Sequence, residues 1–304
     1  MNRYEALITR ARAGEPILID GGTGSEVLRR GAPRLANGWS GGSVSTHPDL
    51  VRQVHLDYLA TGAELLASNT FATGRNILED AGVADQFEVV NRRAVELAVE
   101  ARTEAGADHV VVAGGISNWS FLPERPPLDV LHRNTVEQAI IMRDAGADLI
   151  SLEMMVDIER MTTTLDAVST VGLPIWVGFS IGPEEGHALS ELADPVPLRY
   201  GDLVTDAVEV AARYELVDAM FMMHSDVRLT EAGIAAIRSA WGGPLGAYAH
   251  AAVVVDGEFS HDDVITPEDY ASYVPSWQAA GATIIGGCCG IGPEHMRLVA
   301  GLVG

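Results

Sequence analysis

The strongest constraint on the fold is a regular alternation of short apolar runs with longer segments of helical periodicity, repeated along the whole chain. This alternation is typical of βα units that build a parallel sheet. Eight units are expected. The strands are predicted over residues 16–22, 64–70, 109–117, 149–155, 174–181, 219–224, 245–251 and 282–289. The helices are predicted over residues 48–62, 85–106, 133–146, 157–171, 202–214, 229–241, 267–280 and 292–303.

Three predicted helices end on a similar tripeptide, in which a glycine precedes alanine. Glycine can adopt the left-handed conformation that ends a helix before the next strand. The tripeptides are Thr61-Gly62-Ala63, Ala145-Gly146-Ala147 and Ala280-Gly281-Ala282. Eight such units in 304 residues fit an α/β fold of the (β/α)8 TIM-barrel type, which typically needs about 250 residues plus insertions. A doubly wound open sheet is the alternative, and no linker divides the chain, so residues 1–304 are expected to form a single domain.

The charge balance limits the partners of this chain. It carries 42 Asp and Glu against 20 Lys and Arg, a formal net charge of −22, which would repel nucleic acids and anionic membrane surfaces. The N-terminal segment has no apolar signal region, and no run of about 18 apolar residues occurs. We therefore expect a cytoplasmic protein that acts on small molecules. Its oligomeric state, a homo-oligomer included, stays open.

Polar residues collect at the carboxyl ends of the predicted strands. In a (β/α)8 barrel these ends meet at one face, where the βα loops form the active site. The bias toward this face supports both the barrel and an enzymatic function. The residues concerned are Asp20, Asn69, Glu153, His224, His250, Cys288 and Cys289.

The two cysteines of the chain are adjacent, at the end of the last predicted strand. Neighbouring Cα atoms lie about 3.8 Å apart, closer than the roughly 4.4 Å that a disulfide usually needs. Successive side chains of a strand point to opposite faces, but Gly286, Gly287 and Gly290 allow the backbone to turn, so that Cys288 and Cys289 can face one ion. Thiolate ligands favour zinc among common metals. The alternative is that both are small buried apolar residues.

Two of the nine histidines end predicted barrel strands. Strand six lies two places from strand eight around the ring, so the imidazole of His224 can reach the two sulfur atoms. His224 is therefore a candidate metal ligand, or else a group that supports the ligands or contacts substrate. His250 is expected behind the ligands or against the substrate. The others have positions typical of solvent-facing or hydrogen-bonding roles: His47, His55, His109, His132, His187, His261 and His295.

Two acidic residues, Asp20 and Glu153, end otherwise apolar strands. A buried carboxylate is costly unless it is paired, and a bound ammonium group would be such a partner. The alternative is a structural ion pair with a loop arginine such as Arg75 or Arg125.

A glycine-rich segment, residues 21–27, follows the first strand. It contains only the first half of the dinucleotide-binding pattern G-x-G-x-x-G, with Val27 in place of the third glycine. We therefore do not expect a dinucleotide site. The P-loop pattern and the H-E-x-x-H zincin pattern are both absent from the sequence.

Several segments together resemble the zinc-dependent homocysteine S-methyltransferase family. The resemblance runs through nearly the whole chain, and residues 113–117 with 180–184 are closest to the branch that includes betaine–homocysteine methyltransferase. The matching segments are Leu18-Ile19-Asp20-Gly21-Gly22-Thr23-Gly24-Ser25-Glu26 with Arg30-Gly31, His47-Pro48, Val51-Arg52-Gln53-Val54-His55, Ser68-Asn69-Thr70-Phe71, Val112-Ala113-Gly114-Gly115, Asp148-Leu149-Ile150-Ser151-Leu152-Glu153, Trp277-Gln278-Ala279-Ala280-Gly281-Ala282 and Ile285-Gly286-Gly287-Cys288-Cys289-Gly290.

This resemblance implies a (β/α)8 barrel and a zinc ion, Zn2+, held by three cysteines. Two of them match Cys288 and Cys289. The third stands in the family at the end of strand six in a Gly-Val/Ile-Asn-Cys phrase, where this chain has Met222-Met223-His224-Ser225. A Cys2His site, or an altered one, is the implied result. By the same resemblance, Asp20 and Glu153 would hold the amino group of homocysteine.

The resemblance also implies a reaction. Zinc would stabilise the thiolate of the acceptor near pH 7, where a free thiol of pKa about 8.5 is mostly protonated. The sulfur would then attack a methyl group of a sulfonium or quaternary ammonium donor. If the acceptor is homocysteine, the product is methionine.

Aromatic side chains are expected around the positive charge of the donor. Trp39 and Phe71 are the first candidates and Trp119 the third, with buried packing as the alternative for each. Asn69 is assigned to the same substrate pocket. Two departures affect the substrate: Ala72 stands where betaine-using relatives have tyrosine, and His250 where many relatives have the asparagine of a Tyr-Pro-Asn phrase.

The sequence leaves two rival functions. One is a different metal-assisted reaction on the same barrel, a demethylation or a hydrolysis with water in the open metal position. The other is a non-catalytic barrel that binds an onium compound or a metal.

Overall fold

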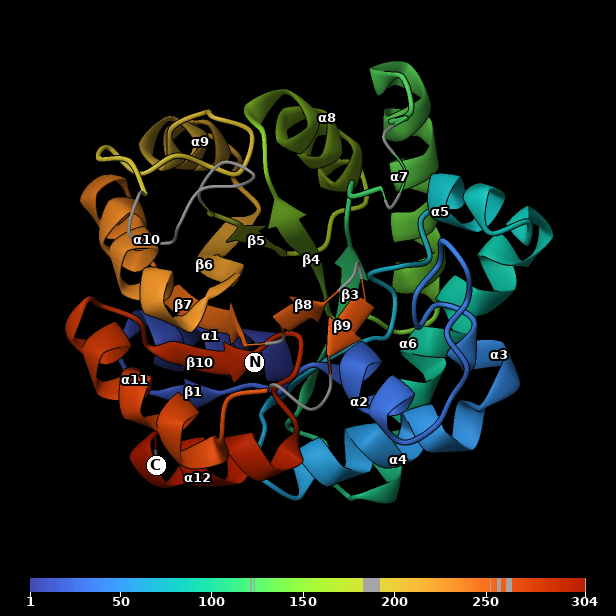
Figure 1. Cartoon of the computed structure of the whole chain (residues 1–304), viewed down its shortest axis with the longest axis horizontal. Coiled ribbons are helices and arrows are strands. Elements are labelled where there is room, and N and C mark those ends of the chain that lie inside the picture. The colour runs from blue at the N-terminus through green and yellow to red at the C-terminus, as the bar shows by residue number, and fades with distance from the viewer. Residues whose placement is uncertain are drawn as a thin grey trace.

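The computed structural model is a barrel of parallel strands surrounded by helices (Figure 1). It describes residues 1–120, 122, 124–182, 192–251, 253–255, 258–260 and 264–303. The eight strands pair in the order β1-β10-β7-β6-β5-β4-β3-β2. Their bounds are β1 Ile17–Leu18, β2 Leu65–Ala67, β3 Val111–Ile116, β4 Leu149–Met155, β5 Ile175–Phe179, β6 Val217–Asp226, β7 Leu245–His250 and β10 Ile284–Gly287. Each overlaps a predicted strand, and β6 extends beyond the predicted residues 219–224 at both ends.

The first and second strands close the ring. The backbone N–H of Glu64 donates to the carbonyl of Leu18 (2.8 Å), and the N–H of Asp20 donates to the carbonyl of Leu65 (3.1 Å). These bonds place β1 beside β2, while β1 also pairs with β10 on its other edge. The (β/α)8 prediction is thus confirmed, and the doubly wound open sheet is excluded.

The predicted helices form the outer ring, visible around the strands in Figure 1. They are α4 Pro48–Leu59, α6 Phe87–Glu104, α7 Leu128–Asp144, α8 Ile158–Ser169, α9 Val204–Ala211, α10 Val227–Ala240, α11 Pro267–Ala279 and α12 Pro293–Val303. Glycines at three of their ends have left-handed φ angles, as expected from the repeated tripeptide: Gly62 (95°), Gly146 (105°) and Gly281 (108°). Among the described helices, none combines the length and apolar character needed to cross a membrane.

Several further elements were not predicted. They are α1 Arg3–Arg12, α2 Thr23–Arg29, α3 Ser43–Thr46, α5 Arg75–Asp80, the 3-10 helix η1 Ala84–Gln86, and the hairpin of β8 Val253–Val255 and β9 Glu258–Ser260. Most of them belong to the βα connections at the mouth of the barrel, where insertions in this fold are usual.

Helix α1 fills the end of the barrel opposite the strand carboxyl ends. Its buried residues Tyr4, Leu7, Ile8 and Ala11 recur at helical spacing and pack in one cluster with inward-facing strand residues such as Trp176. The indole N–H of Trp176 donates to the Tyr4 hydroxyl at 3.2 Å. Because this end is packed with side chains, the other end is left for chemistry.

Two strands lose their regular pairing near their carboxyl ends. The register between β4 and β5 shifts between Leu152 and Met155, and the register between β6 and β7 shifts between Met223 and Asp226. Each irregularity contains a residue other than glycine with positive φ, Met154 (59°) and His224 (45°). Bulges of this kind redirect side chains beside functional sites.

Candidate active site

The structure brings His224, Cys288 and Cys289 together at the barrel mouth. The Nδ1 atom of His224 lies 3.4 Å from the Sγ of Cys288 and 3.6 Å from the Sγ of Cys289, and the two sulfurs are 3.8 Å apart. For tetrahedral zinc with bonds of about 2.3 Å to sulfur and 2.0–2.1 Å to nitrogen, ligand atoms should be about 3.8 Å (S to S) and about 3.6 Å (S to N) apart. The three atoms therefore have the spacing of a zinc site with one open position.

A tight turn after β10 makes this convergence possible. We call residues 288–291 the cysteine turn. It is closed by a hydrogen bond from the Ile291 N–H to the Cys288 carbonyl (3.0 Å), and Gly290 has a φ of 83°. The N–H of Cys288 donates to the Ala249 carbonyl on β7 (2.7 Å). Both sulfurs can thus face His224, which an extended strand would not allow.

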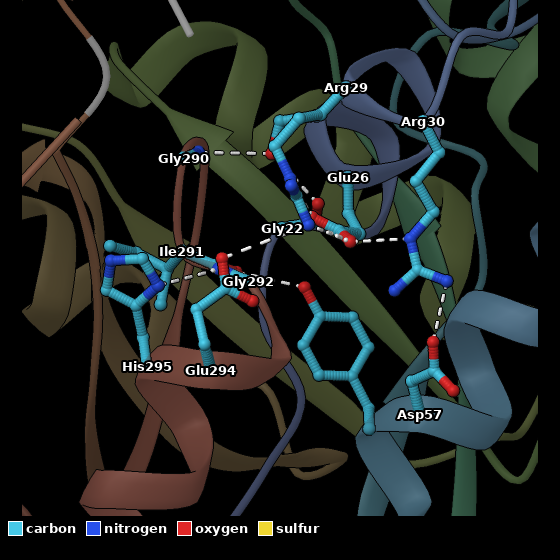
Figure 2. A network of polar contacts seen from close by, with 12 residues as sticks. Gly22, Glu26, Arg29, Arg30, Asp57, Gly290, Ile291, Gly292, Glu294 and His295 are labelled. Atoms are coloured by element: carbon cyan, nitrogen blue, oxygen red, sulfur yellow. Dashed lines mark hydrogen bonds and ion pairs between the residues drawn. The ribbon is translucent and has the colours of Figure 1, made fainter. Parts of the chain in front are cut away.

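The glycine-rich segment receives the cysteine turn. A β-carbon at Gly21 would clash with the Ile291 carbonyl, and one at Gly22 would clash with the Cys288 carbonyl. Instead, the Gly22 N–H donates to the Ile291 carbonyl (2.9 Å), as Figure 2 shows. The Gly290 N–H donates to Ser25 Oγ (3.0 Å). These glycines therefore serve the close approach of two backbones.

A charged network lies beside the glycine-rich segment, between α2 and α4 (Figure 2). Glu26 on α2 accepts hydrogen bonds from Arg29 (2.7 Å) and Arg30 (2.6 Å), and Arg30 also pairs with Asp57 on α4 (2.6 Å). Burial alone would raise the pKa of Glu26, but the two guanidinium groups outweigh it, and the pKa is lowered. The network fixes α2 against α4, and so fixes the glycine-rich segment against which the cysteine turn packs.

The two predicted carboxylates are both buried. Asp20 accepts hydrogen bonds from the Ala67 N–H (2.7 Å) and from the Tyr248 hydroxyl (3.2 Å). Burial raises the pKa of Asp20 well above its ordinary value, although these two bonds oppose the shift. Burial also raises the pKa of Glu153, to about 8. Gly115 on the neighbouring strand makes room for Glu153, since a β-carbon there would clash with its carboxylate.

The alternative of structural ion pairs for these carboxylates is wrong. Arg75 pairs with Glu137 at 2.6 Å, and Arg125 pairs with Asp157 at 2.9 Å. Within the described part of the chain, neither Asp20 nor Glu153 has an arginine partner.

A cavity links these groups. Below it, a smaller hollow continues into the barrel toward Asp20 and shares the wall formed by Ala67, Glu153, Met223 and Tyr248. Asp20 therefore lies deeper in the barrel than the sulfur atoms, and Glu153 borders both spaces. The described wall of the upper cavity consists of Gly21, Gly22, Thr23, Gly24, Trp39, Ala67, Ser68, Asn69, Phe71, Glu153, Met223, His224, Tyr248, Cys288 and Cys289.

Trp39 and Phe71 meet edge to face in the cavity wall. Their ring centroids are 6.0 Å apart at 86°, and both pack in one cluster with Cys289. Trp119 lies elsewhere: it stacks on Tyr200 at 6.4 Å and does not belong to the described wall of the cavity. Of the three predicted aromatics, two thus line the site.

Asn69 lines the cavity but directs its amide toward the loop that carries Trp39. Its Oδ1 accepts from Ser40 Oγ (3.1 Å), and its Nδ2 donates to Ser43 Oγ (3.2 Å). These contacts fix the loop against β2. The structure therefore gives Asn69 a part in holding the wall in place.

His250 lies beside His224, with ring centroids 4.5 Å apart and tilted by 41°. The described wall of the cavity does not include it. Its buried Nδ1 has no hydrogen-bond partner among the described residues. Burial, aided by Arg199 and opposed by Asp226, lowers the pKa of His250 to about 4.

Among the histidines expected in ordinary roles, His55 was predicted wrongly. It is fully buried on α4, and in the described structure neither of its ring nitrogens has a hydrogen-bond partner. Burial lowers its pKa to about 4. His187 and His261 lie outside the described residues.

Tyr248 is a site residue that sequence reasoning missed. Its hydroxyl lies 3.2 Å from Asp20 Oδ1 and 3.0 Å from the Gly21 carbonyl, so it touches both the carboxylate and the glycine-rich segment. Tyr248 lies inside a predicted strand, two residues before His250, whereas site residues were expected at the strand ends. The signal that could have identified it is the Tyr-Pro-Asn phrase of the relatives, which in this chain reads Tyr248-Ala249-His250.

Known proteins match this chain along almost its full length. A family model described as homocysteine S-methyltransferase matches residues 17–303. The homocysteine S-methyltransferase of Escherichia coli (strain K12) is 27% identical, covering 92% of this chain and 93% of that protein. The selenocysteine methyltransferase of Astragalus bisulcatus is 25% identical, covering 94% and 92%.

A solved structure agrees with the fold. The homocysteine methyltransferase MmuM from Escherichia coli, in its oxidized form, superposes with a TM-score of 0.80 at 24% identity, covering 99% of this chain and 100% of that chain. The family match extends from β1 to α12 and so includes every barrel strand and the cysteine turn. The chain therefore belongs to the homocysteine S-methyltransferase family of methyltransferase enzymes.

Proposed function

We propose that this protein transfers a methyl group from a small onium donor to a thiol acceptor, with homocysteine as the acceptor and methionine as the product, and that zinc is its cofactor. The observation that carries the proposal is the triangle of His224, Cys288 and Cys289, whose sides of 3.4, 3.6 and 3.8 Å match tetrahedral zinc. The names of the related methyltransferases agree with the acceptor.

The donor set fits zinc chemically as well as geometrically. Two thiolates and an imidazole are ligands that zinc prefers, and three protein ligands leave the fourth position for a substrate. When bound there, zinc would supply the positive charge that keeps an acceptor sulfur in its nucleophilic thiolate form near neutral pH.

Asp20 and Glu153 are the groups that would bind the ammonium of the acceptor. Both are buried, and burial raises the pKa of each because an isolated carboxylate is poorly solvated in the barrel. A bound ammonium would restore the ionised form by supplying the missing counter-charge. Since Asp20 lies deeper than the sulfur atoms and Glu153 borders both spaces, an acceptor held by its amino end would extend its thiol toward the cysteine turn.

Trp39 and Phe71 would face the donor. A sulfonium or quaternary ammonium is attracted to aromatic faces, and the positive charge disappears as the methyl group leaves. In the step, a bond forms between the acceptor sulfur and the methyl carbon while the bond from that carbon to the onium atom breaks. The released electron pair stays on the former onium atom, so both reactants end uncharged at the reacting atoms.

The direct test is methyl transfer by zinc-loaded protein. Homocysteine, and selenocysteine because of the Astragalus relative, would be offered with a panel of sulfonium and betaine-type donors, and methylated acceptor would be detected by mass spectrometry. Turnover of donor without any acceptor would instead favour demethylation or hydrolysis. Donor binding without turnover would favour a non-catalytic barrel. Either outcome, or the absence of a methylated acceptor, overturns the proposal.

The metal site has its own test. X-ray absorption of the zinc protein should show two sulfur ligands and at least one nitrogen ligand, and the spectrum of His224→Ala should lose one nitrogen. Cys289→Ser should lose one sulfur. An unchanged spectrum in His224→Ala would remove His224 from the site.

A further inference from the structure

His224 has a backbone conformation that histidine rarely adopts. Its φ of 45° lies in the left-handed region, where the β-carbon of an L-residue is crowded. The residue stands inside the register shift between β6 and β7. Such a conformation persists only where the surrounding structure enforces it.

The enforcing contacts come from Ser180 and Arg199, which lie between β5 and α9. The carbonyl oxygen of His224 accepts hydrogen bonds from Ser180 Oγ (2.9 Å) and from Arg199 Nη2 (3.1 Å). The Nε of Arg199 also donates to Ser180 Oγ (2.9 Å). The guanidinium therefore bridges the hydroxyl and the carbonyl, so that each contact supports the other.

Further backbone and side-chain hydrogen bonds connect the ends of β5 and β6 next to His224. The N–H of Arg199 donates to the Ser180 carbonyl (3.2 Å). One residue beyond His224, Ser225 Oγ accepts from the Ile181 N–H (3.0 Å) and donates to the Met223 carbonyl (3.0 Å). The end of β6 is thus tied to the end of β5 at two successive residues.

Arg199 uses its guanidinium on uncharged acceptors. It is partly buried, and within the described residues it has no carboxylate partner. Burial lowers its pKa. A guanidinium removed from water without an acidic partner is unfavourable unless its N–H groups are used. Here the N–H groups of Arg199 donate to Ser180 and to the carbonyl of His224, the residue that faces the two cysteines.

We propose that Arg199 and Ser180 are positioning residues, which hold the backbone of His224 in its left-handed conformation so that Nδ1 faces both sulfur atoms. This inference rests on the proposed role of His224 as a metal ligand. Without the two hydrogen bonds, His224 would relax toward the extended region, and the imidazole would turn away from the cysteine turn. The nitrogen ligand would then be lost although His224 itself is intact.

The test measures zinc affinity by competition with a chromophoric chelator. Arg199→Met removes the donors but keeps an unbranched side chain, and Ser180→Ala removes only the hydroxyl. Each should weaken zinc binding about 10- to 100-fold, as is usual for groups that orient a metal ligand. The cobalt-substituted variants should also show altered visible absorption, because the nitrogen ligand changes.

Arg238→Met is a matched control. Arg238 also donates to carbonyl groups, those of Trp241 (3.0 Å), Gly243 (3.0 Å) and Gly281 (2.9 Å), and burial also lowers its pKa. It lies at the opposite end of the barrel, before β7. Its replacement should lower the stability of the fold but leave the zinc dissociation constant unchanged.

Combining Arg199→Met with His224→Ala distinguishes the positioning role from the proposed metal site. In His224→Ala, Arg199→Met should have no further effect on zinc affinity, because no imidazole remains to be positioned. If His224→Ala weakens zinc binding and neither Arg199→Met nor Ser180→Ala does, the positioning role is wrong. An equal loss from Arg199→Met in both backgrounds also overturns it. If His224→Ala binds zinc as tightly as the parent protein, the proposed metal site itself fails.

Discussion

Gly115 on β3 faces the carboxylate of Glu153 on β4 so closely that a β-carbon at position 115 would clash with Glu153 Oε1. Gly115→Ala should therefore displace the carboxylate from the cavity. We expect the free energy of unfolding to fall by about 1 kcal/mol, at the low end for overpacked cores, because the clashing atoms are the flexible end of Glu153 beside a cavity. We also expect the KM for an amino-acid acceptor to rise at least about tenfold, since a charge-assisted contact is lost.

Gly242→Ala is the control for this substitution. A β-carbon there has no atom of the described structure within 4 Å, and its φ is not in the left-handed region. Steady-state kinetics and urea unfolding should both resemble those of the parent protein. A similar KM in Gly115→Ala and the parent would show that the position of Glu153 does not govern acceptor binding.

Glu153→Gln should change how stability depends on pH. The folded-state pKa of Glu153 is raised to about 8 from an ordinary value of 4.5. Between these values the folded protein retains a proton that the unfolded chain releases, so stability falls as pH rises. Each pKa unit of difference between the folded and unfolded states corresponds to about 1.4 kcal/mol of stability. The amide of Glu153→Gln does not titrate, so this variant does not lose that stability.

As the pH rises from 5 to 8, the free energy of unfolding of Glu153→Gln should increase relative to that of the parent by about 2–4 kcal/mol. Urea unfolding of metal-free protein at both pH values checks this. The exposed Glu209→Gln is the control and should leave the pH dependence unchanged. Parallel stability curves for Glu153→Gln and the parent would contradict a raised pKa.

Tyr248→Phe should weaken acceptor binding without removing a charge. The hydroxyl donates to Asp20, and its loss leaves a buried carboxylate with one bond fewer. This bond favours the ionised form of Asp20, which is the form that would bind the ammonium of the acceptor. Since the loss of a buried hydrogen bond typically costs about 1–3 kcal/mol, we expect acceptor affinity to fall about 5- to 100-fold in titration calorimetry. Tyr214→Phe is the control, because its bond to Asp166 (2.7 Å) lies on the exposed surface. Equal affinities in the two variants would exclude this role of Tyr248.

Gly22→Ala should disturb the cysteine turn. The added β-carbon would clash with the Cys288 carbonyl, and the turn would have to shift. We expect zinc affinity to fall at least about tenfold, as when a group that supports metal ligands is replaced. Zinc should accordingly raise the melting temperature less in the variant than in the parent. An unchanged zinc-induced rise would show that the turn tolerates displacement.

The barrel could be predicted from the sequence because its strands are apolar and bounded by glycine. Strands such as Val111–Ile116 are buried at every position, which distinguishes them from amphipathic helices. The convergence of Asp20, Glu153, His224 and the cysteines could be predicted as well, because the carboxyl ends of the strands of a barrel meet at one face.

Other features depend on contacts that no local pattern records. The conformation of His224 is associated with hydrogen bonds from Arg199, which is 25 residues away in sequence. Tyr248 reaches Asp20 across 228 residues. Helix α1 does have an amphipathic pattern, but its place inside the barrel end follows from packing against Trp176 and its neighbours. Such relations arise from the closed ring and become visible only once it is assembled.

The glycine-rich segment and the cysteine turn that packs against it come from opposite ends of the barrel sequence. Gly22 follows the first strand, and Cys288 follows the last. A ribosome therefore makes the glycine-rich segment about 270 residues before the two cysteines. The segment cannot contact the cysteine turn until β10 pairs with β1. Metal capture at this site would be one of the final events of folding, which makes zinc retention a sensitive report on whether the whole barrel has closed.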